Sequence, residues 1–313
     1  MMKKYVVLLL MQALALAVGA GESAPVWKGL FGKMKTIAVC APGLPGKSSE
    51  VDLALKNLRE AGYKVKVMPN ARNNEVSRKM VDADLRAADF MQAYCDPEVE
   101  AIWCVRGGNG SLQVAMLLDW EKLRNRKLPV IGFSNITELH NMMLKHGVGH
   151  VFSGPSLTQL TTCNAKTIAW FSRAVANEAQ PEIQLKVIRG KDCSGFPAGG
   201  HLTLYQRSYC AGCAPASDGR IIFLESPRSK PLQNAAKELE LLRQKGAFDR
   251  CAAVVFGNIK GKAGEVDKVI RDFAAKVKCP VYCDFPYGHQ ADNFLIDFER
   301  EVFISSDGKL QIK

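Results

Sequence analysis

The chain has 313 residues, of which 47% are hydrophobic and 23% charged. This composition fits a globular protein of two or three domains and excludes collagen, coiled-coil arrays and long disorder. The 42 Lys and Arg residues outnumber the 31 Asp and Glu residues, for a net charge of +11, which could favour anionic partners. No long basic run or basic–aromatic motif accompanies this charge, so we do not expect nucleic-acid binding.

The first 20 residues have the three parts of a secretory signal peptide. Residues 1–4 are positive, 5–18 are almost wholly apolar, and Val18-Gly19-Ala20 offers small residues for cleavage. The apolar part is shorter than the ~20 residues of a membrane-spanning helix. We therefore expect export to the periplasm with no span left after processing, or a cytoplasmic protein if the signal is not used. Residues 21–35 are expected to form a tether.

Ten cysteines follow, at positions 40, 95, 104, 163, 193, 210, 213, 251, 279 and 283. Cys40 and Cys104 lie in apolar runs, where a thiol usually behaves as a small hydrophobic group. Cys210-Ala-Gly-Cys213 has the spacing of half a zinc site, but the next close pair lies far along the chain. A local disulfide or two buried thiols fit this motif better, and we expect no metal.

Strand and helix patterns alternate from residue 36 to about 175. Short apolar or alternating runs predict strands at 36–40, 63–68, 101–105 and 129–133, and helical spacing predicts helices at 48–61, 77–94, 111–123 and 136–145. Such alternation is typical of a doubly wound, mostly parallel sheet. We therefore predict an N-terminal α/β domain over residues 36–175.

The pattern loosens after about residue 180. Residues 182–188 alternate like an antiparallel strand, and further strands are predicted at 220–224, 252–256, 281–284 and 301–305, with a helix at 232–245. We predict a linker over 176–196 and a smaller α/β domain over 197–313.

The first candidate site is the turn Arg106-Gly107-Gly108-Asn109-Gly110-Ser111, between a predicted strand and helix. Glycines allow close backbone approach, and a helix N-terminus offers free N–H groups to an anion. A phosphate-binding loop would carry Lys after the last Gly, and this turn does not. The ligand could be a carboxylate or an oxyanion, and a tight turn without a ligand fits equally well.

The second candidate is Gly132-Phe133-Ser134-Asn135, which also follows a strand and precedes a helix. A serine on such an elbow has an exposed hydroxyl, and the N–H of the next residue can face an oxyanion. The α/β-hydrolase pattern needs glycine where this chain has Ile136, so the chain is not a standard member of that fold. Ser134 could instead cap the helix.

A nucleophilic serine needs a base, usually histidine, and a group that orients the base. We interpret His140, His146 and His150 as ordinary helix or loop residues. His201 follows two glycines, and His289 lies in Pro286-Tyr287-Gly288-His289, just beyond a late strand. Glu225 ends another apolar strand, where it lies either at a site or at a solvated turn.

Together these segments resemble the LD-carboxypeptidases over about residues 36–300. These serine peptidases include murein tetrapeptide carboxypeptidases and microcin C self-immunity peptidases. The resemblance is carried, in order, by Arg106-Gly107-Gly108-Asn109-Gly110-Ser111 with Leu117-Leu118-Asp119, Gly132-Phe133-Ser134, Gly199-Gly200-His201-Leu202, Leu224-Glu225, and Gly288-His289 with Asn293.

The resemblance implies a class I glutamine amidotransferase-like N-terminal domain, a smaller C-terminal α/β domain and an active site between them. It also implies a homodimer and no cofactor. The implied catalytic residues are Ser134 as nucleophile, His289 as base and acid, and Glu225 as the group that orients His289. The backbone N–H groups of Gly108 and Asn135 would form the oxyanion hole. Arg106, Gly107 and His201 would bind substrate.

The chain departs from the family pattern around these residues. Asn135 replaces an Asp, and His201 replaces an Asn. Ser-Pro-Arg-Ser-Lys-Pro follows Glu225 in place of an acidic run, and the segment after Asn293 also differs. We therefore expect the hydrolytic chemistry to be kept while the parts that shape the substrate have changed.

The function that the resemblance implies is hydrolysis of an L,D peptide bond, which releases a terminal D-Ala from murein tetrapeptide during peptidoglycan turnover or recycling. One alternative is the same Ser–Glu–His chemistry on a peptide–nucleotide or other acyl-amide substrate. A second is an exported wall-peptide binding protein without turnover.

Overall fold

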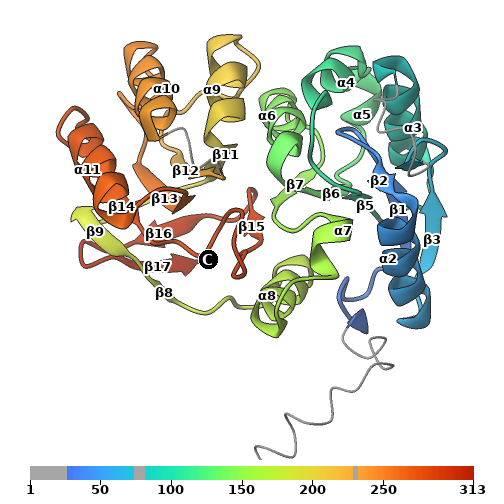
Figure 1. Cartoon of the computed structure of the whole chain (residues 1–313). Coiled ribbons are helices and arrows are strands. Elements are labelled where there is room, and N and C mark those ends of the chain that lie inside the picture. The colour runs from blue at the N-terminus through green and yellow to red at the C-terminus, as the bar shows by residue number, and fades with distance from the viewer. Residues whose placement is uncertain (1–26, 74–81, 228–231) are drawn as a thin grey trace, which may run out of the picture.

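The computed structural model describes residues 27–73, 82–227 and 232–313. The predicted signal peptide, residues 1–20, lies outside these ranges. None of the helices described is long and apolar enough to cross a membrane. Two α/β halves lie side by side, the N-terminal one in blue and green and the C-terminal one in yellow to red (Figure 1).

The N-terminal half is built on a six-stranded sheet of order β15-β7-β6-β5-β1-β3. Its parallel strands are β1 (Thr36–Cys40), β3 (Lys64–Val67), β5 (Ala101–Cys104), β6 (Pro129–Gly132) and β7 (His150–Ser153). The edge strand β15 (Ile296–Asp297) is antiparallel. A doubly wound sheet was predicted and is confirmed, although β7 and β15 were not predicted as strands.

Helices cover both faces of this sheet because its strands are apolar on both sides. Against one face pack α3 (Ala83–Cys95), α4 (Ser111–Leu117) and α6 (Thr137–His146). Against the other pack α2 (Ser48–Glu60), α7 (Leu157–Leu160) and α8 (Ala165–Val175). The helix predicted at 111–123 is interrupted at Leu118 and Asp119 and resumes as α5 (Trp120–Leu123).

The C-terminal half has a five-stranded sheet of order β11-β12-β13-β14-β9. The parallel strands β11 (Pro197–His201), β12 (Ile221–Ser226), β13 (Ala253–Ile259) and β14 (Val281–Cys283) end in the antiparallel β9 (Lys186–Arg189). One face carries α9 (Leu202–Cys210), α10 (Leu232–Gln244) and α11 (Ala263–Ala274). The other face packs on an antiparallel sheet of β10 (Cys193–Gly195), β16 (Val302–Ile304), β17 (Lys309–Ile312) and β8 (Ile183–Gln184).

The two halves share one hydrophobic core and exchange strands. Residues 176–196, predicted as a linker, contribute β8, β9 and β10 to the C-terminal sheets. In the opposite direction, Ile296 of β15 pairs with Ser153 at the edge of the N-terminal sheet. A core cluster runs without a break from α3 and α6 to β12, β13 and β16. The halves are therefore held together by backbone pairing as well as by side-chain packing.

The segment predicted as a tether, 21–35, is not a tether in its described part. Trp27 and Phe31 are buried, and their rings lie 5.6 Å and 5.2 Å from the ring of Trp103. Phe31 also donates its backbone N–H to the Tyr63 hydroxyl at 3.0 Å. Burying two large aromatic rings outweighs the entropy of ordering so short a segment, so it belongs to the N-terminal core.

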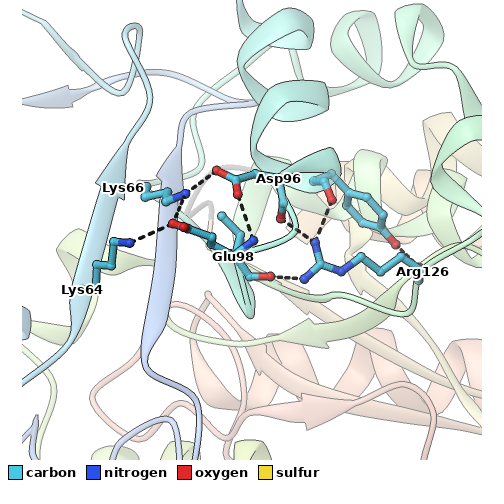
Figure 2. Close-up of polar contacts among 7 residues, drawn as sticks. Lys64, Lys66, Asp96, Glu98 and Arg126 are labelled. Carbon is cyan, nitrogen blue, oxygen red and sulfur yellow. Dashed lines mark hydrogen bonds and ion pairs between the residues drawn. The ribbon is translucent and has the colours of Figure 1, made fainter.

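A polar clasp fixes the amino ends of β5 and β6 (Figure 2). Lys66 on β3 reaches Asp96 at 2.5 Å and Glu98 at 2.8 Å, in the loop that precedes β5. Arg126, before β6, donates to the carbonyl oxygens of Asp96 at 2.7 Å and of Val99. The clasp lies at the end of the sheet away from the two glycine turns, which follow the carboxyl ends of β5 and β6.

All ten cysteines are free thiols. Cys40 and Cys104 are buried and adjacent on β1 and β5, as predicted for small hydrophobic side chains. Cys210 is exposed at the end of α9, whereas Cys279 and Cys283 are buried. The Cys210–Cys213 motif is therefore not a pair of buried thiols.

Candidate active site

Ser134 lies on a tight turn at the carboxyl end of β6. After the extended Phe133, Ser134 has a φ of 61° and begins the 3-10 turn η2 (Ser134–Ile136), which leads into α6. This left-handed conformation is uncommon outside glycine and is concentrated at functional sites. A Cβ on Gly132 would lie 2.7 Å from the Ile136 side chain, so the turn requires glycine there. The segment has the strand–turn–helix geometry expected of a serine elbow.

The glycine turn after β5 lies directly against this elbow. A Cβ on Gly107 would lie 2.6 Å from the Ser134 Cβ and 3.0 Å from both Ser134 Oγ and the Asn135 backbone nitrogen. Gly108 has a φ of 106°, and a Cβ there would lie within 2.5 Å of the Leu44 side chain. Glycine at these positions leaves space beside the Ser134 hydroxyl and the Asn135 N–H, where a reacting carbonyl could sit.

Leu44 and Arg106 complete the loop around this space. The backbone N–H of Leu44 donates to the Gly107 carbonyl at 2.9 Å, which fixes the loop from outside. Arg106 is partly exposed, in the same loop as Gly107 and Gly108. Its guanidinium is the group in this loop best suited to a substrate carboxylate, because Arg can bind both oxygens of that group.

Glu225 and His289 form a hydrogen-bonded pair at the edge of the C-terminal half. His289 Nδ1 lies 2.9 Å from Glu225 Oε2, and Glu225 is fully buried near the end of β12. Gly288 has a φ of 120°, and a Cβ there would lie 2.9 Å from the Glu225 Cβ. Asn258 donates to the His289 carbonyl at 3.0 Å, and Asn293 accepts from the Gly288 N–H at 3.0 Å. The imidazole is therefore held in one orientation by its carboxylate and by its backbone.

This pair lies beside the serine elbow. The His289 ring centroid is 4.6 Å from that of Phe133, the residue before Ser134. His201, at the end of β11, stands 6.1 Å from His289 at an interplanar angle of 88°. Its backbone N–H donates to Thr137 Oγ1 at 3.1 Å, one turn beyond Ser134. All eight predicted site residues thus lie on adjoining segments, although no hydrogen bond joins the Ser134 hydroxyl to the His289 ring.

Tyr287, two residues before His289, is a buried tyrosine beside the Glu225–His289 pair. The Tyr287 hydroxyl is 2.7 Å from Ser153 Oγ. Burial, and secondarily the negative charge of Glu225, hold the pKa of Tyr287 well above its usual range. Tyr287 therefore stays neutral, and its hydroxyl links the loop after β14 to Ser153 of the N-terminal half by a hydrogen bond. Within residues 27–73, 82–227 and 232–313, no group of three or more His, Cys, Asp or Glu residues could hold a metal ion.

Comparison with known families agrees with this geometry. Residues 37–154 match the LD-carboxypeptidase N-terminal domain, and residues 194–304 match the LD-carboxypeptidase C-terminal domain. The chain belongs to the LD-carboxypeptidase family. It is therefore a serine-type carboxypeptidase, as its resemblance to that family implied.

Two relatives of this LD-carboxypeptidase span nearly its whole length. It is 26% identical to the murein tetrapeptide carboxypeptidase of Pseudomonas aeruginosa over 87% of this chain and 92% of the relative. It is also 26% identical to a probable murein peptide carboxypeptidase of Bacillus subtilis, over 90% of this chain and 92% of the relative.

Solved structures share the fold of this LD-carboxypeptidase. An MccF-like protein from Bacillus anthracis superimposes with a TM-score of 0.80 at 20% identity, over 90% of this chain and 97% of the other. The muramoyltetrapeptide carboxypeptidase of Oxalobacter formigenes gives 0.76 at 23% identity, over 89% and 98%. The predicted two-part α/β architecture is confirmed.

The sequence analysis of this LD-carboxypeptidase missed several residues that shape the site. Glu138, four residues after Ser134, is buried beside the elbow, and Asn135 and Ser111 are buried next to it. The position of Glu138 one helical turn beyond Ser134 was the available signal. Leu44 and Asn258 carried none, because their contacts depend on loops that meet only in the folded chain.

Proposed function

We propose that this protein hydrolyses an L,D peptide bond and releases a terminal D-amino acid, D-Ala in the case of murein tetrapeptide. The observation that carries this proposal is the 2.9 Å contact between His289 Nδ1 and Glu225 Oε2, beside the left-handed Ser134. The names of the Pseudomonas aeruginosa and Bacillus subtilis relatives support the choice of a murein peptide.

In the proposed first step, His289 takes the proton of the Ser134 hydroxyl through Nε2, because Nδ1 faces Glu225. Ser134 Oγ attacks the carbonyl of the residue before the D-amino acid, and the N–H groups of Gly108 and Asn135 stabilise the oxyanion. His289 then donates its proton to the departing amine. Glu225 keeps the imidazole oriented and stabilises its cationic form.

In the second step, His289 removes a proton from water, which attacks the ester carbonyl. His289 then returns that proton to Ser134 Oγ as the ester bond breaks and the shortened peptide leaves as a carboxylic acid. We assign the binding of the terminal carboxylate to Arg106, because a guanidinium can bind both oxygens of that group. Gly107 provides the space for the substrate backbone, and His201 borders the imidazole on the side of the C-terminal half. The proposed reaction uses no cofactor.

The test is mass spectrometry of murein tetrapeptide incubated with the chain from residue 21 onward. We expect the wild type to remove one alanine and Ser134→Ala to remove none. If neither protein changes the tetrapeptide, the murein assignment is wrong. A peptide–nucleotide conjugate assayed in parallel tests the alternative substrate, since microcin C7 self-immunity proteins share this fold.

We also propose that residues 1–20 direct export to the periplasm, that 36–175 and 197–313 form most of the two domains, and that two copies associate. The charge and hydropathy pattern of residues 1–20 supports export, and the family resemblance supports a homodimer. Fractionation of cells that express the full chain, followed by N-terminal sequencing, tests export. Light scattering of the purified protein tests dimerisation.

A further inference from the structure

A buried polar cluster adjoins the serine elbow. Its members are Ser111 at the start of α4, Asn135 in η2 and Glu138 in α6, each no more than 1% exposed. Asn135 Oδ1 accepts from the Ser111 backbone N–H at 3.0 Å, and Asn135 Nδ2 donates to Glu138 Oε2 at 2.9 Å. The Ser111 hydroxyl donates to the Asn135 carbonyl.

The cluster joins the glycine turn after β5 to the serine elbow after β6, the two turns that border the space beside the Ser134 hydroxyl. Ser111 ends the glycine turn, and Asn135 follows the candidate nucleophile. Their hydrogen bonds use both ends of the Asn135 side chain as well as its backbone carbonyl. These hydrogen bonds hold Asn135 against the glycine turn and thereby help to fix the direction of its backbone N–H.

Glu138 is the acidic residue of the cluster and the member that faces Arg207. Burial raises the pKa of its carboxyl, and the nearby Arg207 partly offsets this effect. Arg207, on α9, places Nε 3.7 Å from Glu138 Oε1, and its side chain is half exposed. The cluster therefore holds one carboxyl group, and Arg207, the cation paired with it, remains in contact with solvent.

We propose that Glu138 is a positioning residue for the oxyanion hole, acting through the Asn135 side chain on the Asn135 N–H. This inference rests on the proposed function, because it concerns the hole in which that reaction would occur. Removal of Glu138 leaves the Asn135 amide without its acceptor and lets the elbow turn relative to Gly107 and Gly108. Small displacements of this kind reduce catalysis strongly.

The cluster also accounts for Asn135 where the family pattern has Asp. An Asp at position 135 would place a second carboxylate about one hydrogen-bond length from Glu138 Oε2. Like charges in a buried site repel, so one group must take up a proton or move. We infer that Asn135 and Glu138 form a matched pair, and that the buried polar cluster tolerates one carboxylate but not two.

The test measures the rate at which a fluorophosphonate labels Ser134, because this reaction needs the nucleophile and the oxyanion hole but no particular peptide. We expect Glu138→Ala to be labelled about 10-fold more slowly than the wild type. Arg126→Ala is the matched control, since it breaks the clasp at the far end of the same sheet. It should lower the melting temperature without changing the labelling rate.

A rescue experiment separates positioning from a merely structural role. Asn135→Asp should be labelled about 10-fold more slowly than the wild type, because two carboxylates then repel each other within the cluster. The double variant Asn135→Asp/Glu138→Ala contains one carboxylate again and should be labelled faster than either single variant. A double variant as slow as the slower single variant contradicts the matched pair.

The outcomes distinguish this inference from the function on which it rests. If wild-type Ser134 is not labelled at all, the proposed function fails and the inference falls with it. If the wild type is labelled and Glu138→Ala reacts at the same rate, only the inference is wrong. With murein tetrapeptide, the inference further predicts a lower kcat for Glu138→Ala at an unchanged KM, because an oxyanion hole acts on the transition state.

Discussion

His289 Nδ1 lies 2.9 Å from Glu225 Oε2, although 64 positions separate the two residues in the chain. Glu225 ends an apolar strand, and His289 follows a glycine in the loop after β14. The parallel sheet places both strand ends on the same edge. Because the carboxylate is fully buried, its hydrogen bond to the imidazole is shielded from water and sets the orientation of the ring.

Glu225→Gln tests the charge of this pair at nearly constant shape. The amide can hold the imidazole in the wrong tautomer and cannot stabilise its cationic form, so kcat should fall by about 10²- to 10⁴-fold. Steady-state kinetics with a peptide substrate measure the effect, and thermal unfolding checks that the fold is kept. A folded variant with wild-type kcat would exclude Glu225 as the orienting group.

Gly107→Ala tests the space between the two turns. The added methyl carbon would lie 2.6 Å from the Ser134 Cβ and 3.0 Å from the Asn135 nitrogen. We expect turnover to be lost and stability to fall by about 1–3 kcal/mol, since the elbow must shift.

Gly264→Ala is the matched control for this substitution. Gly264 lies in α11, and a Cβ there would have no atom within 4 Å. An alanine should stabilise the protein by about 0.4–1 kcal/mol and leave kcat unchanged. Full activity in Gly107→Ala would show that the space beside Ser134 is not used by substrate.

His140 predicts how stability depends on pH. Its ring is fully buried in α6, neither ring nitrogen has a hydrogen-bond partner within the described structure, and burial lowers the pKa of His140 to about 3. In the unfolded chain His140 therefore takes up a proton as the pH falls below about 6.5, whereas in the folded chain it stays neutral until the pH approaches 3. The stability that the neutral ring provides is present above pH 6.5 and is lost as the pH falls toward 3.

Between pH 6.5 and 5 this loss amounts to about 2 kcal/mol for one group. His140→Leu should remove that slope in urea unfolding while keeping stability at neutral pH, because it deletes two unpaired polar atoms. His146→Gln, near the end of the same helix, should keep most of the slope. An identical slope in wild type and His140→Leu would assign the acid sensitivity to other groups.

Arg126→Ala tests the clasp of Figure 2. The guanidinium donates to three backbone carbonyls, that of Tyr94 at the end of α3 and those of Asp96 and Val99 in the turn before β5. Removing it leaves these partly buried acceptors without their donor and should lower the free energy of unfolding by about 1–3 kcal/mol. Activity at low temperature should be unchanged. A fall in kcat without a fall in stability would contradict a purely structural role.

The sequence predicted the parts of the fold that local pattern controls. Strands such as 101–105 and 129–133 were short apolar runs between turn residues, and the structure has β5 and β6 there. The edge strand β15 was missed because a strand of two residues is too short to show an alternating hydrophobic pattern. Its pairing with β7 also depends on the return of the chain from the C-terminal half. The tether predicted over 21–35 is wrong for the described part of that segment, because the burial of Trp27 and Phe31 depends on Trp103, which is distant in sequence.

The site was predicted in the same uneven way. Ser134 and the glycines were visible because each lies in a turn between a predicted strand and a predicted helix. His289 and Glu225 were weak candidates individually and gained support only from the family resemblance. Glu138 was not predicted, because a glutamate in the first turn of a helix usually favours the helix dipole and faces solvent. Only the packing of α6 against α4 and α9 buries it.

The most direct test of the account compares two murein tetrapeptides that differ only in the configuration of the terminal alanine. Chiral analysis of the released amino acid should show D-Ala from the natural peptide, with little or no alanine from the L-Ala epimer. Ser134→Ala should release neither. Release of L-Ala at a similar rate, or release of D-Ala by Ser134→Ala, would contradict a serine LD-carboxypeptidase centred on Ser134.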